Sequence, residues 1–278
     1  MEFISKNKSF EDLIFLGKIC FDTLTSNIAH KPESNDFCGI YFEGRNRQIN
    51  CIEDFAAIHS FKVFSRCNYP MLVLSPNPEN LLNNNPIYTN VIHIKTPEYN
   101  SHDQYSQFMI KDVWNYIPKY FKRLMFFHPD GFLCKFGWEN WILNNKIDFV
   151  GAAWCHLPSI DINDSGVWKN TGLPRIPVGN GGFSYRSRDI CERISNTYGH
   201  LKMRESGRTD DRCPPEDLFY SHLINGTQCG KVANIQEAMQ FSLDPITPEE
   251  YSKKLSFGFH YPRKNNEFQK ERNYCLSL

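Results

Sequence analysis

The order of strand-like and helix-like segments between residues 37 and 130 constrains the fold of this chain more than any other feature of its sequence. Short apolar runs typical of buried strands alternate there with segments in which apolar residues recur at helical spacing. The strand-like runs are FCGIYF, MLVLS, NVIHIKT and RLMFF, and the helix-like segments are CIEDFAAIHSFKVFSR and SHDQYSQFMIKDVWNYI. This alternation predicts an α/β fold in which a largely parallel sheet carries helices on both faces.

Polar residues follow two of these strand-like runs. Glu43 and Arg45 come after the first, and the turn His128-Pro129-Asp130-Gly131 comes after RLMFF. Ligands of such sheets bind beyond the carboxyl ends of the strands, so both segments are expected to open onto one crevice. Asp130 can be an ordinary turn residue or a carboxylate ligand of a hard divalent cation.

Beyond residue 130 the alternation becomes less regular. We expect a short helix at WENWILNNKI, a strand at DFVGAAW, and helices at SRDICERISNTYG and PEDLFYSHLING. Residues 156–176 are expected to form a loop, and residues 200–215 a mobile loop, because glycine and proline interrupt polar sequence there. The segment 245–278 is expected to be mostly irregular, and its FGFH motif matters for a site only if it folds back over the crevice.

The segment VGNGGFSYR concentrates glycine at Gly179, Gly181 and Gly182, around Asn180. Glycine lets another group lie against the backbone, so this segment suits either a ligand such as a sugar ring or a bend at a tightly packed corner. It lacks both the GxxxxGK[ST] and the GxGxxG patterns, which disfavours a P-loop NTPase and a Rossmann dehydrogenase.

Glu216 and Asp217 are adjacent carboxylates at the start of a predicted helix, behind Pro214 and Pro215. Proline is favoured at the first position of a helix, and the helix dipole favours negative charge there. The pair is therefore either ordinary helix-start chemistry or a general base that points into a site. Because a helix N-terminus stabilises a carboxylate, Asp217 is expected to be ionised at neutral pH.

Charge and cysteine content bear on partners and location. The chain has 31 basic and 31 acidic residues, so it lacks the global positive field that collects nucleic acid, which is not an expected partner. Its ten cysteines include no CxxC pair and are expected to stay reduced. No apolar run reaches about 18 residues and no signal-peptide pattern opens the chain, so we expect no transmembrane segment and a cytoplasmic location.

Five segments occur together in an order that resembles a bacterial and viral family of proposed glycosyltransferases, catalogued as a domain of unknown function. They are FFHPDGF, WENWILNNKIDFVGAAW, VGNGGFSYRSRDI, PEDLFYSHL and FGFH. This family is similar to nucleotide-sugar transferases with the GT-A fold, and the glycine-rich segment followed by Glu-Asp is similar to the inverting β-1,3-galactosyltransferases. The resemblance implies a GT-A-like fold with a mixed central sheet flanked by helices.

The resemblance, together with helical periodicity near the N-terminus, also implies a division of the chain. We expect a helical extension over residues 1–36 and one GT-A-like domain over residues 37–278. Within that domain, residues 37–130 would form the nucleotide-binding half, and residues 131–278 would form the acceptor half and the C-terminal tail.

Roles for single residues follow from the same resemblance. Asp130 corresponds to the last aspartate of the metal-binding motif, with His128 in place of the first acidic residue, and His260 is a further ligand of Mn²⁺ or Mg²⁺. Asp217 corresponds to the general base, with Glu216 in a supporting role. The residues expected to face the donor, together with Asp130, are Glu43, Arg45, Asn180, Gly181 and Gly182.

These assignments imply a glycosyltransferase that moves a sugar, with inversion, from a nucleotide-sugar donor such as a UDP-sugar to a hydroxyl of a glycan or another acceptor. One alternative is a retaining transferase on the same fold, in which Asp217 is not the base. Another is a non-catalytic protein that binds nucleotide sugars or glycans. A sugar transferase that modifies DNA is disfavoured by the balanced charge.

Overall fold

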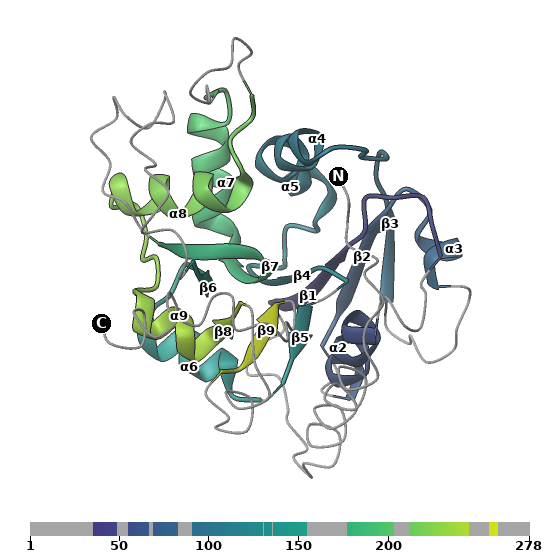
Figure 1. The fold of residues 1–278 in the computed structure, drawn as a ribbon, viewed down its shortest axis with the longest axis horizontal. Helices are drawn as coiled ribbons and strands as arrows, with labels where there is room; N and C mark the ends of the chain where they lie inside the picture. Colours follow the sequence, from purple (N-terminus) through teal and green to yellow (C-terminus); the bar gives the residue numbers. More distant parts are fainter. Residues whose placement is uncertain are drawn as a thin grey trace, which may run out of the picture.

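The computed structural model describes residues 36–48, 55–66, 69–82, 91–129, 131–134, 136–154, 177–202, 212–244 and 256–260. The expected helical extension lies almost wholly outside these residues, as do the expected loop at 156–176 and most of the segment at 200–215. In the described part, a six-stranded sheet and a three-stranded sheet form the framework on which the helices pack (Figure 1).

The large sheet has the spatial strand order β3-β2-β1-β4-β7-β6. The strand bounds are Phe37–Phe42 for β1, Met71–Ser75 for β2, Val91–Lys95 for β3, Arg123–Phe127 for β4, Phe149–Ala153 for β6 and Val178–Ser187 for β7. The first four strands run parallel, and β7 is antiparallel to both of its neighbours. The predicted α/β fold with a mixed central sheet is therefore confirmed.

Helices cover both faces of this sheet (Figure 1), which is why every residue of β1 and β2 is buried. One face carries α2 (Phe55–Arg66), α6 (Trp138–Asn145) and α9 (Ile235–Phe241). The other carries α4 (His102–Gln107), the π-helix η1 (Phe108–Asp112), α5 (Val113–Tyr116), α7 (Arg188–Tyr198) and α8 (Glu216–Gly226). A short helix, α3 (Pro78–Leu82), follows β2. None of the described helices is long and apolar enough to cross a membrane.

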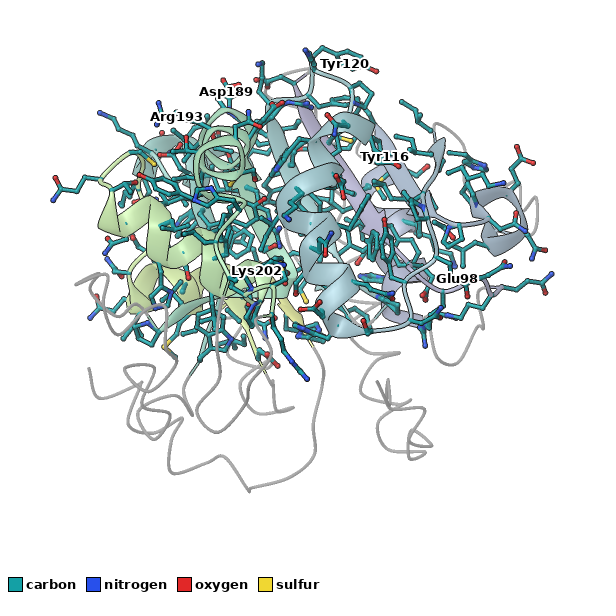
Figure 2. The ribbon with its side chains drawn as sticks, turned by 90° about the horizontal axis from the view of Figure 1, so that it is seen from above. Glu98, Tyr116, Tyr120, Asp189, Arg193 and Lys202 are labelled. Carbon is teal, nitrogen blue, oxygen red and sulfur yellow. The ribbon has the colours of Figure 1, made fainter. Side chains whose placement is uncertain are left out.

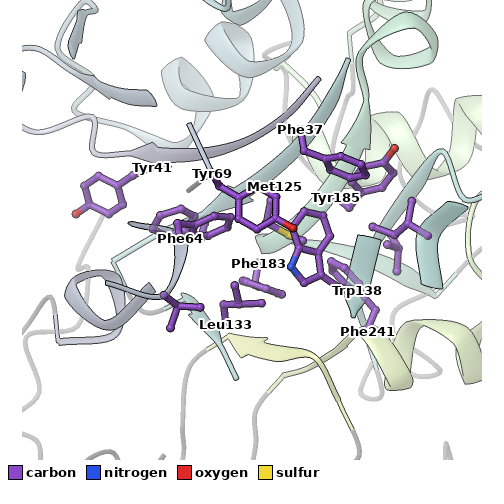
Figure 3. Close-up of a cluster of buried hydrophobic side chains, with 14 of the residues drawn as sticks. Phe37, Tyr41, Phe64, Tyr69, Met125, Leu133, Trp138, Phe183, Tyr185 and Phe241 are labelled. Carbon is purple, nitrogen blue, oxygen red and sulfur yellow. The ribbon is translucent and has the colours of Figure 1, made fainter. Parts of the chain in front are cut away.

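The core between the large sheet and α2, α6 and α9 is rich in aromatic rings (Figure 3). Phe37 meets Trp138 edge-on with 5.2 Å between ring centroids, and Phe64 stacks on Phe127 at 5.6 Å. Such offset and edge-on contacts add to the free energy gained by burying the rings. They hold α2 and α6 against the central strands, so that the carboxyl ends of β1 and β4 have fixed positions.

The small sheet joins three segments that lie far apart in the sequence. β5 (Gly131–Leu133) pairs antiparallel with β9 (Gly258–His260), which pairs in parallel with β8 (Ser242–Leu243). His260 stands opposite Gly131, so the FGFH motif does fold back beside the turn that follows β4. β8, β9 and α9 were not expected from the sequence, because strands of two or three residues and a helix of seven show too little periodicity to detect.

Arg188, at the start of α7, holds the end of the α4–η1–α5 run in place. Its buried guanidinium donates to the backbone oxygens of Trp114 and Ile117, each at 2.8 Å, and of Pro118 at 3.1 Å. These are carbonyls at a helix end, which lack partners within the helix. The Arg188 side chain therefore donates to three carbonyl oxygens. It holds the start of α7 against the C-terminal end of the α4–η1–α5 run.

Replacing Arg188 with methionine keeps much of the packing and removes every donor. We expect Arg188→Met to lower the free energy of unfolding by about 3 kcal/mol, because buried carbonyls lose charged hydrogen-bond partners. The measurement is urea denaturation, with Arg193→Met as the matched control. Arg193 lies on the outer surface of the same helix (Figure 2) and donates to the Cys229 carbonyl in an exposed contact. Equal losses in the two variants would contradict this role for Arg188.

Candidate functional site

A cavity of about 250 Å³ opens where β1 and β4 end. Its walls come from the residues that follow these two strands, from α4, from the start of β7, from the start of α8 and from the end of β9. Because β7 runs antiparallel to β4, its first residues lie beside the carboxyl end of β4. The crevice expected beyond the strand ends is therefore present, and it combines segments that lie far apart in the sequence, from Phe42 to His260.

The structure brings the predicted site residues together. Those within the described part of the chain all line this cavity: Glu43, Arg45, Asn180, Gly181, Gly182, Glu216, Asp217 and His260. Asp130, the predicted metal ligand, lies outside the described residues, although its neighbour Pro129 lines the cavity.

Glu216, the first residue of α8, is buried and forms an ion pair with Arg186 of β7. Its Oε1 accepts from Arg186 Nη2 and from the Tyr105 hydroxyl, both at 3.2 Å. Arg186 is fully buried, and its guanidinium lies 4.6 Å from the ring centroid of Phe126 and 5.3 Å from that of Tyr220. A buried guanidinium needs an anionic partner and gains from aromatic faces, so this pair fixes the start of α8 on the sheet.

Asp217 is less buried than Glu216 and lines the cavity, with Oδ1 accepting from its neighbour Leu218 N at 2.8 Å. Burial raises the pKa of Asp217 to about 7, and the charge of Glu216 contributes to the same shift. Backbone hydrogen bonds and Arg186 oppose this shift but are outweighed. The helix N-terminus was expected to keep Asp217 ionised at neutral pH, but burial beside a second carboxylate acts in the opposite direction on its pKa and is the stronger effect.

The glycines of β7 make room for two of the site's own side chains. A Cβ at Gly181 would stand 2.3 Å from Glu216 Oε1, and one at Gly182 would stand 2.1 Å from His260 Nε2. Gly179 has a φ of +135°, a conformation that side chains rarely tolerate. The space in front of Gly181 and Gly182 was expected to hold a ligand, but at the Cβ positions it holds a carboxylate and an imidazole.

Asn180 and Asp244 attach the end of β8 and the end of β9 to this strand. The Asn180 side chain accepts from Gly182 N at 3.0 Å and donates to Asp244 Oδ2 at 2.5 Å. His260 Nδ1 lies 3.4 Å from the same Asp244 oxygen. Asp244 was not singled out in the sequence, since a lone aspartate near the end of an unrecognised strand gives no signal.

Glu43 and Arg45 occupy the β1 side of the cavity. Glu43 is buried and accepts from Arg45 Nε at 2.8 Å and from Arg47 Nε at 2.6 Å. Burial acts to raise the pKa of Glu43, but the hydrogen bond from Arg45 and the charge of Arg47 lower it overall. The charge of Glu43 is thus used within the protein to orient Arg45, whose guanidinium remains partly exposed at the cavity.

Within the described ranges, no group of three or more His, Cys, Asp or Glu side chains is arranged to hold a metal ion. His128 and His260 both line the cavity, with ring centroids 6.1 Å apart. Imidazole nitrogens are common metal ligands, so the two rings are candidate donors. The donor set therefore fits a metal only if Asp130, which lies between β4 and β5, adds a carboxylate.

Besides Asp244, two further residues at the site were not expected from the sequence. Tyr105 lines the cavity and bonds to Glu216, but a tyrosine on an apolar helix face looks like a core ring in the sequence. Arg186 gave a usable signal, since an arginine inside an otherwise buried strand needs a buried partner.

Comparison with known proteins gives a family and distant structural likenesses. No curated protein matches this chain. The Mn/GDP form of core-mannan synthase A (CmsA/Ktr4) from Aspergillus fumigatus is 11% identical with a TM-score of 0.42, over 64% of this chain and 68% of that chain. Galactosyltransferase LgtC with donor and acceptor sugar analogs is 10% identical with a TM-score of 0.46, over 87% of this chain and 96% of that chain. An active-site mutant of LgtC has the same coverage, with 11% identity and a TM-score of 0.47.

Likenesses this distant carry no argument about activity. The family match is of a different kind, because it covers residues 89–260 and includes all five motifs quoted above. That family is described as "Protein of unknown function (DUF5672)", and the chain belongs to it.

Proposed function

We propose that this chain is a glycosyltransferase that moves a sugar from a nucleotide-sugar donor, such as a UDP-sugar, to a hydroxyl of a glycan or another acceptor. The resemblance carried by the five motifs supports this function, as does a mixed α/β sheet with a cavity beyond the ends of β1 and β4. The observation that carries the proposal is the carboxylate pair Glu216–Asp217 at that cavity, in which Glu216 is ion-paired with Arg186 and Asp217 lines the cavity.

The two carboxylates have different roles in this proposal. Glu216 is held by Arg186 and Tyr105, so its oxygen already serves as an acceptor inside the protein. Asp217 faces the cavity and takes the proton from the acceptor hydroxyl as that oxygen attacks the anomeric carbon. A base whose pKa lies near the working pH combines a useful ionised fraction with enough basicity. Direct attack opposite the departing nucleotide inverts the anomeric centre.

The donor's phosphates belong, in this proposal, on the side of Arg45, His128 and His260. Asp130 and His260 would hold a divalent cation, and imidazole ligands favour Mn²⁺ over Mg²⁺, which prefers oxygen. Such a cation offsets the charge that develops on a departing diphosphate. Arg45, oriented by Glu43, supplies a fixed positive charge at the same wall.

A thermal-shift panel of nucleotide sugars, each with and without Mn²⁺, tests the function. One nucleotide sugar is expected to raise the unfolding temperature, since a ligand at about 100 times its Kd adds roughly 2.7 kcal/mol of stability. The same donor should then be hydrolysed slowly without acceptor. Binding without hydrolysis or transfer would favour the non-catalytic alternative, and no stabilisation by any nucleotide sugar would refute the proposed donor class.

Asp217→Asn keeps the side-chain shape and removes the base. We expect transfer to fall by about 10²- to 10⁴-fold, the usual range for general-base catalysis, with donor binding retained. Asp189→Asn, on the exposed surface of α7 (Figure 2), is the matched control and should transfer normally. Glu216→Gln should instead lower stability, because it leaves Arg186 buried without its partner. Normal transfer by Asp217→Asn alongside a fully stable but inactive Glu216→Gln would reverse the two roles.

The pH dependence of kcat/KM reports the same group. Only the ionised form of Asp217 can accept a proton, so activity should fall about tenfold per pH unit below an inflection near 7 and level off above it. Glu216→Gln removes a negative neighbour, so the inflection should move to lower pH in whatever folded fraction remains. An inflection near pH 4 in the wild type would show that burial does not control the pKa of Asp217.

A further inference from the structure

Tyr105 joins the two sides of the candidate site. It lies on α4 and its ring is buried, with 5.1 Å between its centroid and that of Phe42. Its hydroxyl oxygen lies 2.8 Å from His128 Nε2 and 3.2 Å from Glu216 Oε1. The same oxygen therefore contacts the residue that follows β4 and the residue that opens α8.

This hydroxyl has one proton to donate, and its surroundings decide where the proton goes. A tyrosine phenol is protonated at neutral pH, so the hydroxyl carries a proton in both contacts. Glu216 is ion-paired with Arg186 and can only accept, so the Tyr105 proton is donated to Glu216 Oε1. The contact with His128 then requires the imidazole to donate, which places a proton on Nε2 of His128.

We propose that Tyr105 is a positioning residue that holds His128 in its Nε2-protonated form and orients Glu216 at the start of α8. The position of the His128 proton does not depend on the proposed transferase activity. The effect of Tyr105 on turnover does rest on that proposed function.

The His128 proton can be observed without any substrate. Two-bond ¹⁵N–¹H NMR spectra of the histidine rings, recorded above the ordinary histidine pKa, distinguish the two neutral forms. His128→Gln identifies the signal by its loss. We expect wild-type His128 to carry a slowly exchanging proton on Nε2. In Tyr105→Phe, that proton should exchange with water at least about tenfold faster, because its hydrogen-bond acceptor is gone.

Transfer kinetics form the second arm of the test. Tyr105→Phe should lower kcat by about 10- to 100-fold, the effect of removing a hydrogen bond to a charged group, with the donor KM changed less than about threefold. Tyr116→Phe is the matched control, because Tyr116 lies on the same helical run (Figure 2) and does not line the cavity. It should keep both the wild-type kcat and the wild-type His128 signal.

Two results would overturn the proposal: a wild-type His128 with its proton on Nδ1, or a Tyr105→Phe variant with unchanged kcat and unchanged exchange at His128. The first needs no variant, so it decides the question even if Tyr105→Phe folds poorly. If no nucleotide sugar is ever transferred, the NMR arm still decides the role of Tyr105, and only the proposed function fails.

Discussion

The buried ion pair between Arg186 and Glu216 is the contact on which the candidate site depends. Arg186 lies among aromatic rings out of reach of water, so its charge requires a carboxylate beside it. That carboxylate belongs to the first residue of α8, so the pair fixes where α8 begins and where Asp217 stands. Glu216 also acts on Asp217 as a neighbouring negative charge. A contact that anchors a helix to the sheet thus also contributes, after burial, to the raised pKa of the candidate base.

The consecutive glycines of β7 allow this arrangement. At Gly181 the carboxylate of Glu216 lies directly on the strand, and at Gly182 the ring of His260 does the same. The two interpretations of the glycine-rich segment, a packed corner and a ligand floor, are therefore not exclusive. The strand is packed tightly, and the groups packed on it are the ones that line the cavity.

The sequence predicts the framework of this protein better than the chemistry of its site. Buried strands such as MLVLS and RLMFF are continuous apolar runs, so their existence is visible locally, and the alternation with helices then fixes the sheet type. The acidity of Asp217 is not visible locally, because it depends on burial and on neighbours that only the fold assembles. The same holds for Tyr105, whose partners lie on α8 and after β4. The motifs could predict which of their residues belong to the site, whereas the protonation states of these residues could not be predicted from the sequence.

The small sheet has a consequence for the order in which the protein acquires its site during synthesis. The ribosome completes β1, β4 and β7 before it reaches β9, and N-terminal parts of a chain are free to fold first. His260 reaches the cavity only when β9 pairs with β5, and Asp244 bonds to Asn180 in the same corner. The wall that closes the cavity is therefore contributed last. A nascent chain that already has its central sheet therefore still lacks the part of the cavity wall that His260 and the end of β9 supply.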